Sequence, residues 1–133
     1  MSSHRFITQI GMGVDQHGHD NDCSYAAFKA IKDAISTNCL TGLSEICGLK
    51  EPQDLIRMKV HVKIGAPFPE NINEKKVLKA IPLGQKSIEV VKGGLLIKGI
   101  QIDELGDTSD NIIVCNAAVS VSVSINKSIN NLP

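Results

Sequence analysis

Aromatic side chains are scarce in this chain, and tryptophan is absent. Phe and Tyr together make up 3% of the 133 residues, which leaves few platforms on which a protein could stack nucleic-acid bases. An excess of positive charge is missing too, because 14 Lys and Arg balance 14 Asp and Glu. Without a basic field, a phosphate backbone gains little by binding. We therefore expect no nucleic-acid partner and a core built from Ile, Val, Leu and Ala.

Long apolar runs and paired cysteines are also lacking. No run approaches the roughly 20 residues of a membrane span, and the start of the chain, MSSHRFITQIGMG, has no signal-peptide-like apolar stretch. The four cysteines form neither a CxxC pair nor a disulfide-rich spacing. These absences predict a cytoplasmic protein with reduced thiols and no membrane partner. The length suits one domain, residues 1–133, that can fold without disulfides.

The first part of the chain predicts a strand followed by a helix. In RFITQIGMG, residues 5–13, alternation places Phe6, Thr8 and Ile10 on one face, and we expect Gly11 and Gly13 to end the strand. Residues 23–36, CSYAAFKAIKDAIS, carry apolar side chains at helical spacing. The polar residues 20–22 in front of them can cap the free amides of this helix.

The remainder alternates strands with one short helix. We expect a strand over residues 55–67, a helix over 73–82 capped by Asn73, and a strand over 111–125. Residues 86–105 form one long strand or two strands interrupted at Gly93 and Gly94, where a β-bulge or a ligand close to the backbone would account for the glycines. This order predicts an α+β domain in which two helices cover one face of a mixed β-sheet.

The other face of that sheet is polar along two strands. Its side chains are Lys59, His61, Lys63, Ser120, Ser122 and Ser124. Such a face can simply contact water. Small serines also allow another sheet to approach closely, whereas a solvated face usually carries longer charged groups. We favour the second interpretation, which predicts a homo-oligomer.

The densest group of chemically active residues is GMGVDQHG, residues 11–18. Its pattern G-x-G-x-D-x-H-G places Gly11, Gly13, Asp15, His17 and Gly18 within eight positions. It resembles the signature of a small family of conserved hypothetical proteins found in several bacteria and, with a long N-terminal extension, in plants. The similarity extends to the Ala-rich helix, the VKIGAP strand and the last strand. The resemblance implies no known activity.

A second resemblance concerns the fold alone. The order strand, long helix, strand, short helix, strand, strand is similar to that of AroH-type chorismate mutase and of YjgF-like proteins. That resemblance implies a trimer whose sheets surround an axis, with ligand clefts between neighbouring subunits. Fold does not determine function, so no catalytic residue is carried over from either group.

The motif does not fit a nucleotide-phosphate loop. A dinucleotide fingerprint requires a third glycine where Gln16 stands, and Asp15 would repel a pyrophosphate. A metal site is one alternative: if the strand continues, Asp15, His17 and His19 point to one side and could bind zinc or another divalent transition metal.

Acid–base chemistry is the other alternative. A histidine titrates near neutral pH, and a carboxylate two residues away can orient it, so Asp15 and His17 are the candidate catalytic residues. Both side chains could equally serve only to cap their own loop. Lys63 or His61, from this subunit or the next, could face a ligand carboxylate. The residues expected to contact the ligand are Gly11, Gly13, Gly18, His61 and Lys63.

These observations lead to three functional hypotheses. The first is a small-molecule enzyme with active sites at subunit interfaces, built on the GxGxDxHG loop. The second is a non-catalytic oligomeric module that binds a small ligand or a metal through the same loop. The third is an interaction protein in which the loop only fixes the assembly. The sequence specifies neither the substrate nor a cofactor.

Overall fold

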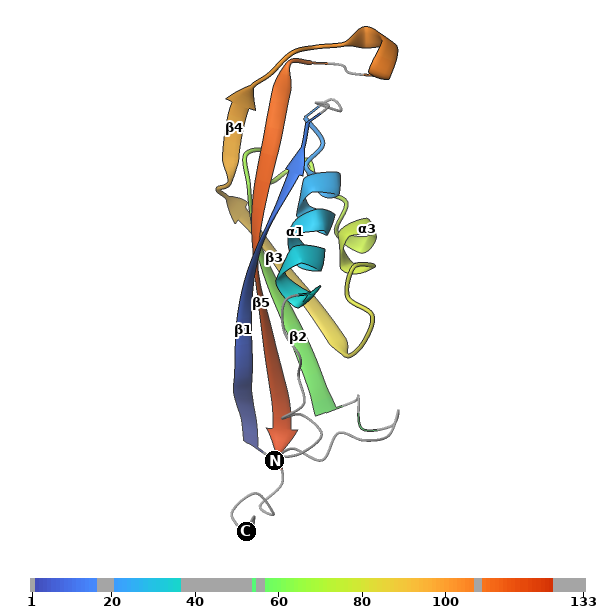
Figure 1. Ribbon diagram of the computed structural model, residues 1–133. Helices are drawn as coiled ribbons and strands as arrows, with labels where there is room; N and C mark the ends of the chain where they lie inside the picture. Colours follow the sequence, from blue (N-terminus) through green and yellow to red (C-terminus); the bar gives the residue numbers. More distant parts are fainter. Residues whose placement is uncertain (1, 17–20, 37–53, 55–56, 107–108, 126–133) are drawn as a thin grey trace.

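The computed structural model describes residues 2–16, 21–36, 54, 57–106 and 109–125, with side chains described from residue 7 to residue 124 of these ranges. The elements, in chain order, are β1 (Ser2–Asp15), α1 (Ser24–Ser36), β2 (Met58–Ala66), α3 (Glu74–Leu78), β3 (Gln85–Lys92), β4 (Leu95–Lys98), a 3-10 turn (Asp103–Leu105) and β5 (Asn111–Ile125) (Figure 1).

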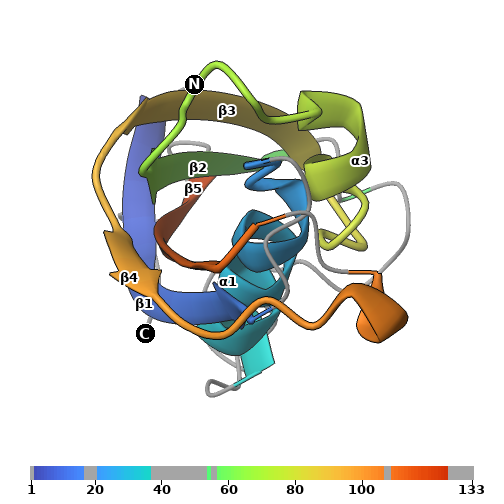
Figure 2. The same cartoon turned by 90° about the horizontal axis from the view of Figure 1, so that it is seen from above.

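In the described part of the chain, five strands form one mixed sheet. Four of them have the order β1-β5-β2-β3, and the fifth, β4, pairs with β5. β2 and β3 run parallel, while β5 runs antiparallel to β1, β2 and β4. The sheet twists strongly and curls around α1, beside which α3 lies (Figure 2). The predicted α+β class with a mixed sheet is therefore confirmed. None of the described helices has both the length and the apolar character needed to span a membrane.

Alternation along the two central strands produces the core. Met58, Val60, Val62 and Ile64 of β2 are buried, as are Val119, Val121 and Val123 of β5. The residues between them, Lys59, His61 and Lys63, are exposed. Because side chains of a strand alternate between its faces, this pattern places these seven apolar residues of β2 and β5 under the helices, while Ala118 lies on the opposite face beside Lys63. The faces predicted for these two strands are confirmed.

The long helix packs against β1 through small residues. Ala26, Ala30 and Ala34 of α1 are fully buried. On β1, a Cβ at Gly11 would collide with the backbone of Ala30 and Ala34, and one at Gly13 with the backbone of Ala26 and Ala30. The two glycines therefore allow the helix to lie directly on the strand.

This packing corrects the prediction for the end of the first strand. Gly11 and Gly13 do not end β1, which continues to Asp15. Both are buried on its helix-facing side, whereas Ile10 is 69% exposed and Met12 is 58% exposed on the other side. Ile10 and Met12 point away from the helices, because the inner side of β1 has room only for glycine at positions 11 and 13, whereas Ile7, nearer the start of the strand, packs against the core.

The two helix starts carry the caps that their sequences predict. The Asp22 carboxylate accepts a hydrogen bond from Ser24 N at 2.8 Å, and Asn73 Oδ1 accepts one from Lys76 N at 3.1 Å. Such a cap stabilises a helix by about 1 kcal/mol. The caps fix the orientation of both helix starts, which lie on the same side of the sheet.

The glycine pair at 93 and 94 separates two strands and is not a bulge within one. β3 pairs with β2, whereas β4 pairs with the first part of β5. Gly94 has a φ of 66°, a left-handed conformation that costs glycine little. The chain can therefore leave one partner strand and join another within two residues.

Candidate functional site

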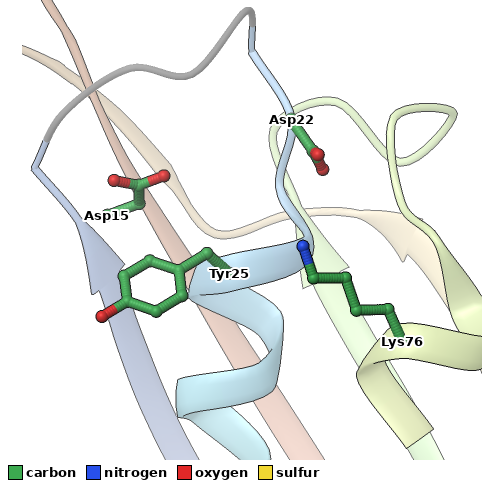
Figure 3. A pocket seen from close by; sticks show the side chains of 4 residues that line it. All are labelled: Asp15, Asp22, Tyr25 and Lys76. Atoms are coloured by element: carbon green, nitrogen blue, oxygen red, sulfur yellow. The ribbon is translucent and has the colours of Figure 1, made fainter. Parts of the chain in front are cut away.

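Asp15 is a buried carboxylate at the edge of a pocket. It is the last residue of β1, and its exposed fraction is 1%. A pocket of about 300 Å³ is lined by Asp15 together with Asp22, Tyr25 and Lys76 (Figure 3). Burial of a carboxylate is costly unless it is hydrogen-bonded or paired, and Asp15 has an interaction partner within the chain. Its position at the edge of the pocket makes it a candidate for contact with a ligand.

Three elements supply these four side chains. Asp22 stands two residues before the first residue of α1, and Tyr25 stands in the first turn of this helix. Lys76 extends from α3 toward the start of α1 (Figure 3). Hydrogen bonds fix the two helices to each other. Cys23 N donates to Asn71 O at 2.9 Å, and Asn73 N donates to Ser24 Oγ at 2.8 Å. The pocket is therefore held by a rigid connection between the helix starts.

Tyr25 is also held from the side of β1. Lys29 Nζ lies 5.0 Å from the centre of the Tyr25 ring, and the same ammonium donates a hydrogen bond to Val14 O at 2.9 Å. A cation placed over an aromatic ring in this way is attracted by about 0.5–1 kcal/mol at an exposed site. The Tyr25 ring thus stands beside the end of β1 that carries Asp15.

The charges of the pocket determine what it can bind. Among the described residues that line the pocket, two carry carboxylates, Asp15 and Asp22, and one, Lys76, carries an ammonium group. Carboxylates accept hydrogen bonds from hydroxyl or ammonium groups, and a lysine attracts an anionic group. The arrangement suits a small polar ligand with donor groups at one end and an acidic group at the other.

A neutral thiol lies close to the pocket. The hydrogen bond with Cys23 and burial raise the pKa of the Cys115 thiol, and the charge of Asp15 adds to this effect. Only a thiolate is a good nucleophile. Cys115, which is fully buried, is therefore a core residue, in line with its position within an apolar strand.

The structure separates the residues that the sequence analysis grouped into one site. Asp15 lies on the helix side of the sheet, whereas His61 and Lys63 are exposed on the opposite face. There His61 Nδ1 lies 2.8 Å from Ser87 Oγ, and Glu89 lies 3.7 Å from His61 Nε2 and 3.9 Å from Lys63 Nζ. Within one subunit, neither His61 nor Lys63 can face the same ligand as Asp15.

The rest of the motif divides into two groups. Gly11 and Gly13 lie against α1, as described above. His17, Gly18 and His19 lie outside the described residues. No group of three or more His, Cys, Asp or Glu side chains within the described ranges could hold a metal ion. The predicted metal site depends on His17 and His19 and stays a prediction.

Sequence reasoning missed Tyr25 and Lys76 as site residues and treated Asp22 only as a cap. Lys76 is 61 positions from Asp15 in the chain, and no local pattern connects them. A signal for Tyr25 exists, because it is the single tyrosine of the chain and stands in the first helical turn after the motif. In the structure Tyr25 lines the same pocket as Asp15, the last residue of the preceding strand.

Comparison with known proteins identifies the family. No curated protein matches this sequence significantly. A crystal structure described as an FtsZ-like protein of unknown function from Nostoc punctiforme is similar, with 37% sequence identity and a TM-score of 0.79 over 93% of this chain and 98% of that one. Residues 5–121 match the family described as Conserved hypothetical protein (Lin0512_fam). The chain therefore belongs to the Lin0512 family of conserved hypothetical proteins.

Proposed function

We propose that this protein is a small-molecule enzyme whose active site is the pocket at the end of β1. The observation that carries the proposal is Asp15, a carboxylate that is 1% exposed and yet lines a pocket of about 300 Å³. In such a position a carboxylate is shielded from water and can exchange a proton with a bound molecule.

Each side chain of the pocket has a role in this proposal. Asp15 takes up and returns a proton, while Asp22 and Lys76 orient a polar substrate through opposite charges. Tyr25 closes the pocket on the side of α1 and offers a hydroxyl as hydrogen-bond donor. His17, two positions after Asp15, is the second proton carrier in the proposed mechanism.

The first experiment is a thermal-shift screen of the native protein against a set of small polar metabolites. We expect ligands that carry both an amino or hydroxyl group and an acidic group to raise the melting temperature, because ligand binding to the folded state stabilises it. Asp15→Asn and Lys76→Ala should remove that increase. The matched controls are Glu104→Gln and Lys75→Ala, which change exposed residues outside the pocket.

Conversion of a ligand from this screen is then followed by NMR. An enzyme changes the ligand over time, and Asp15→Asn should abolish the change while the protein stays folded. A ligand that binds through Asp15 and is never converted would contradict the catalytic part of the proposal and favour a binding module. Ligands whose effect persists in both pocket variants would contradict the site itself.

We also propose that the chain assembles into a homo-oligomer through surfaces that are apolar in the single copy. Ile10 and Met12 of β1 are more than half exposed, and the β4 side chains Leu95, Leu96 and Ile97 are 45–58% exposed. Clusters of large exposed apolar side chains mark interaction surfaces. The sheet face away from the helices has no covering layer among the described elements (Figure 2).

The finer architecture belongs to the same proposal. A mixed sheet with helices on one face and small serines on the other suits the trimeric arrangement of AroH-type and YjgF-like proteins, with three copies around an axis. In that arrangement His61 and Lys63 of one copy can approach the pocket of a neighbouring subunit, although they cannot reach the pocket of their own.

The free buried thiols of Cys23 and Cys115 favour a reducing, cytoplasmic location.

A further inference from the structure

A second pocket lies on the sheet face away from the helices, near the passage from β3 to β4. Its volume is about 230 Å³. The lining residues that carry the argument are Ile10, Lys63, Val91, Lys92, Asn116 and Ala118. It lies on the opposite face of the sheet from Asp15 and does not depend on the catalytic role proposed for Asp15. Ile10 and Lys63 also belong to the face that we propose for assembly, so a neighbouring copy would border the pocket in the oligomer.

Strand register explains why the sheet is hollow at this point. Ala118 of β5 is paired with Ile10 of β1 on one side and Lys63 of β2 on the other. In the next row, Gly65 lies between Asn116 and Val91. The short side chain of Ala118 and the missing one of Gly65 therefore form a floor between taller neighbours.

Gly65 has a specific part in this arrangement. A Cβ at Gly65 would collide with Asn116 Oδ1, so the amide of Asn116 lies over the strand at a position that only glycine leaves open. The amide group is exposed, and no hydrogen-bond partner holds it in the described part of the chain. It is available to a ligand in the pocket.

The charged residues among the described residues that line this pocket are both lysines. Lys63 and Lys92 both line it, and among the described residues Lys92 has no carboxylate partner. The only acidic neighbour of Lys63 described is Glu89, at 3.9 Å with both side chains about half exposed. An exposed pair at that distance contributes little, so Lys63 can still attract a second anion.

We propose that this pocket binds a small carboxylate with a short aliphatic part. The two ammonium groups attract the carboxylate, and the Asn116 amide donates a hydrogen bond to it. Ile10, Val91 and Ala118 cover the aliphatic part. The apolar wall distinguishes this site from a simple anion site, where inorganic phosphate would bind as well as an organic acid.

The test is an NMR titration of the full-length protein labelled with ¹⁵N. Butyrate and butyramide have nearly the same shape, and butylamine has the same four-carbon chain; at neutral pH the three carry negative, zero and positive charge. We expect butyrate to shift the amide signals of Gly93, Gly94 and Ala118 in a saturable way, and the other two compounds to bind at least about tenfold more weakly. Inorganic phosphate should also bind more weakly than butyrate.

Variants locate the effect. Lys92→Gln and Lys63→Gln should each weaken butyrate binding about tenfold, the range expected for losing one charged hydrogen bond. The control Lys86→Gln changes an exposed lysine of β3 that does not line the pocket. Equal shifts from butyrate and butyramide, or an equal loss in the control variant, would overturn the proposal. Stronger binding of phosphate than of butyrate would overturn the assignment to an organic acid.

Discussion

At the scale of single residues, Gly11 and Gly13 show that a sequence pattern can indicate a close approach to the backbone without identifying the group that approaches. Two glycines one position apart indicate that another group approaches the backbone closely. The sequence analysis predicts a ligand as that group. The group that occupies the space is the chain's own helix α1, whose Ala26, Ala30 and Ala34 lie on the strand. Sequence alone does not tell which segment returns to a given strand.

The packing leads to a prediction for both glycines. Gly11→Val and Gly13→Val should each lower the free energy of unfolding by more than about 1 kcal/mol, because the added side chain meets helix backbone that cannot rotate away. Thermal and urea unfolding measure the change. The control is Met12→Val, since Met12 stands between the two glycines and is 58% exposed. If both glycine variants had nearly the native free energy of unfolding, α1 could shift away from the strand at little cost, which would contradict the prediction.

Asp15 is a candidate site residue both in the sequence analysis and in the structure. The motif singles it out, and it is buried at a pocket. Tyr25 and Lys76 join it only because hydrogen bonds between distant segments, such as Asn73 N to Ser24 Oγ, bring the helix starts together. No periodic pattern in the sequence predicts such contacts between distant segments.

At the scale of elements, the alternation of β2 and β5 predicted their buried faces, but the same reasoning does not assign the covered side of β1. Ile7 of that strand packs against the core, whereas Ile10 and Met12, which are also large and apolar, face away from the helices. Alternation reveals two faces without saying which is covered. The decision depends on the backbone distance to α1, which only glycine permits.

The short helix α3 leads to a prediction at this scale. Its start is capped by Asn73 Oδ1, which accepts from Lys76 N at 3.1 Å. Asn73→Ala should lower the free energy of unfolding by about 1 kcal/mol, which corresponds to a fall of about 3–5 °C in melting temperature for a domain of this size. Differential scanning calorimetry measures this fall in melting temperature.

The same variant tests whether α3 positions the candidate site. Lys76 extends from this helix into the pocket, so loss of the cap should also weaken any ligand that needs Lys76. Lys75→Ala is the control, because Lys75 is exposed on the same helix and does not line the pocket. If Asn73→Ala and Lys75→Ala unfold at the same temperature, the cap does not stabilise the helix start.

At the scale of the whole molecule, the sheet face away from the helices poses the main question. Along β5 it presents Ser120, Ser122 and Ser124, which are only half-buried in a single copy. Thr8 Oγ1 lies 3.1 Å from Ser120 Oγ, so part of this face already satisfies its hydroxyl groups within the chain. A face that combines short polar side chains with exposed Ile10 and Met12 can pack against another sheet without leaving many unpaired groups.

The last prediction tests this face directly. In an assembly, Ser122→Arg would insert a long charged side chain where a neighbouring sheet packs, and a buried charge without a partner is strongly destabilising. We expect multi-angle light scattering to show an oligomer, three copies in the proposed arrangement, for the native protein and a folded monomer for Ser122→Arg. The control is Ser36→Arg, which places the same charge at the exposed end of α1. A native protein that is monomeric at micromolar concentration would contradict the assembly, because the exposed side chains of β1 and β4 would then be stable in water alone.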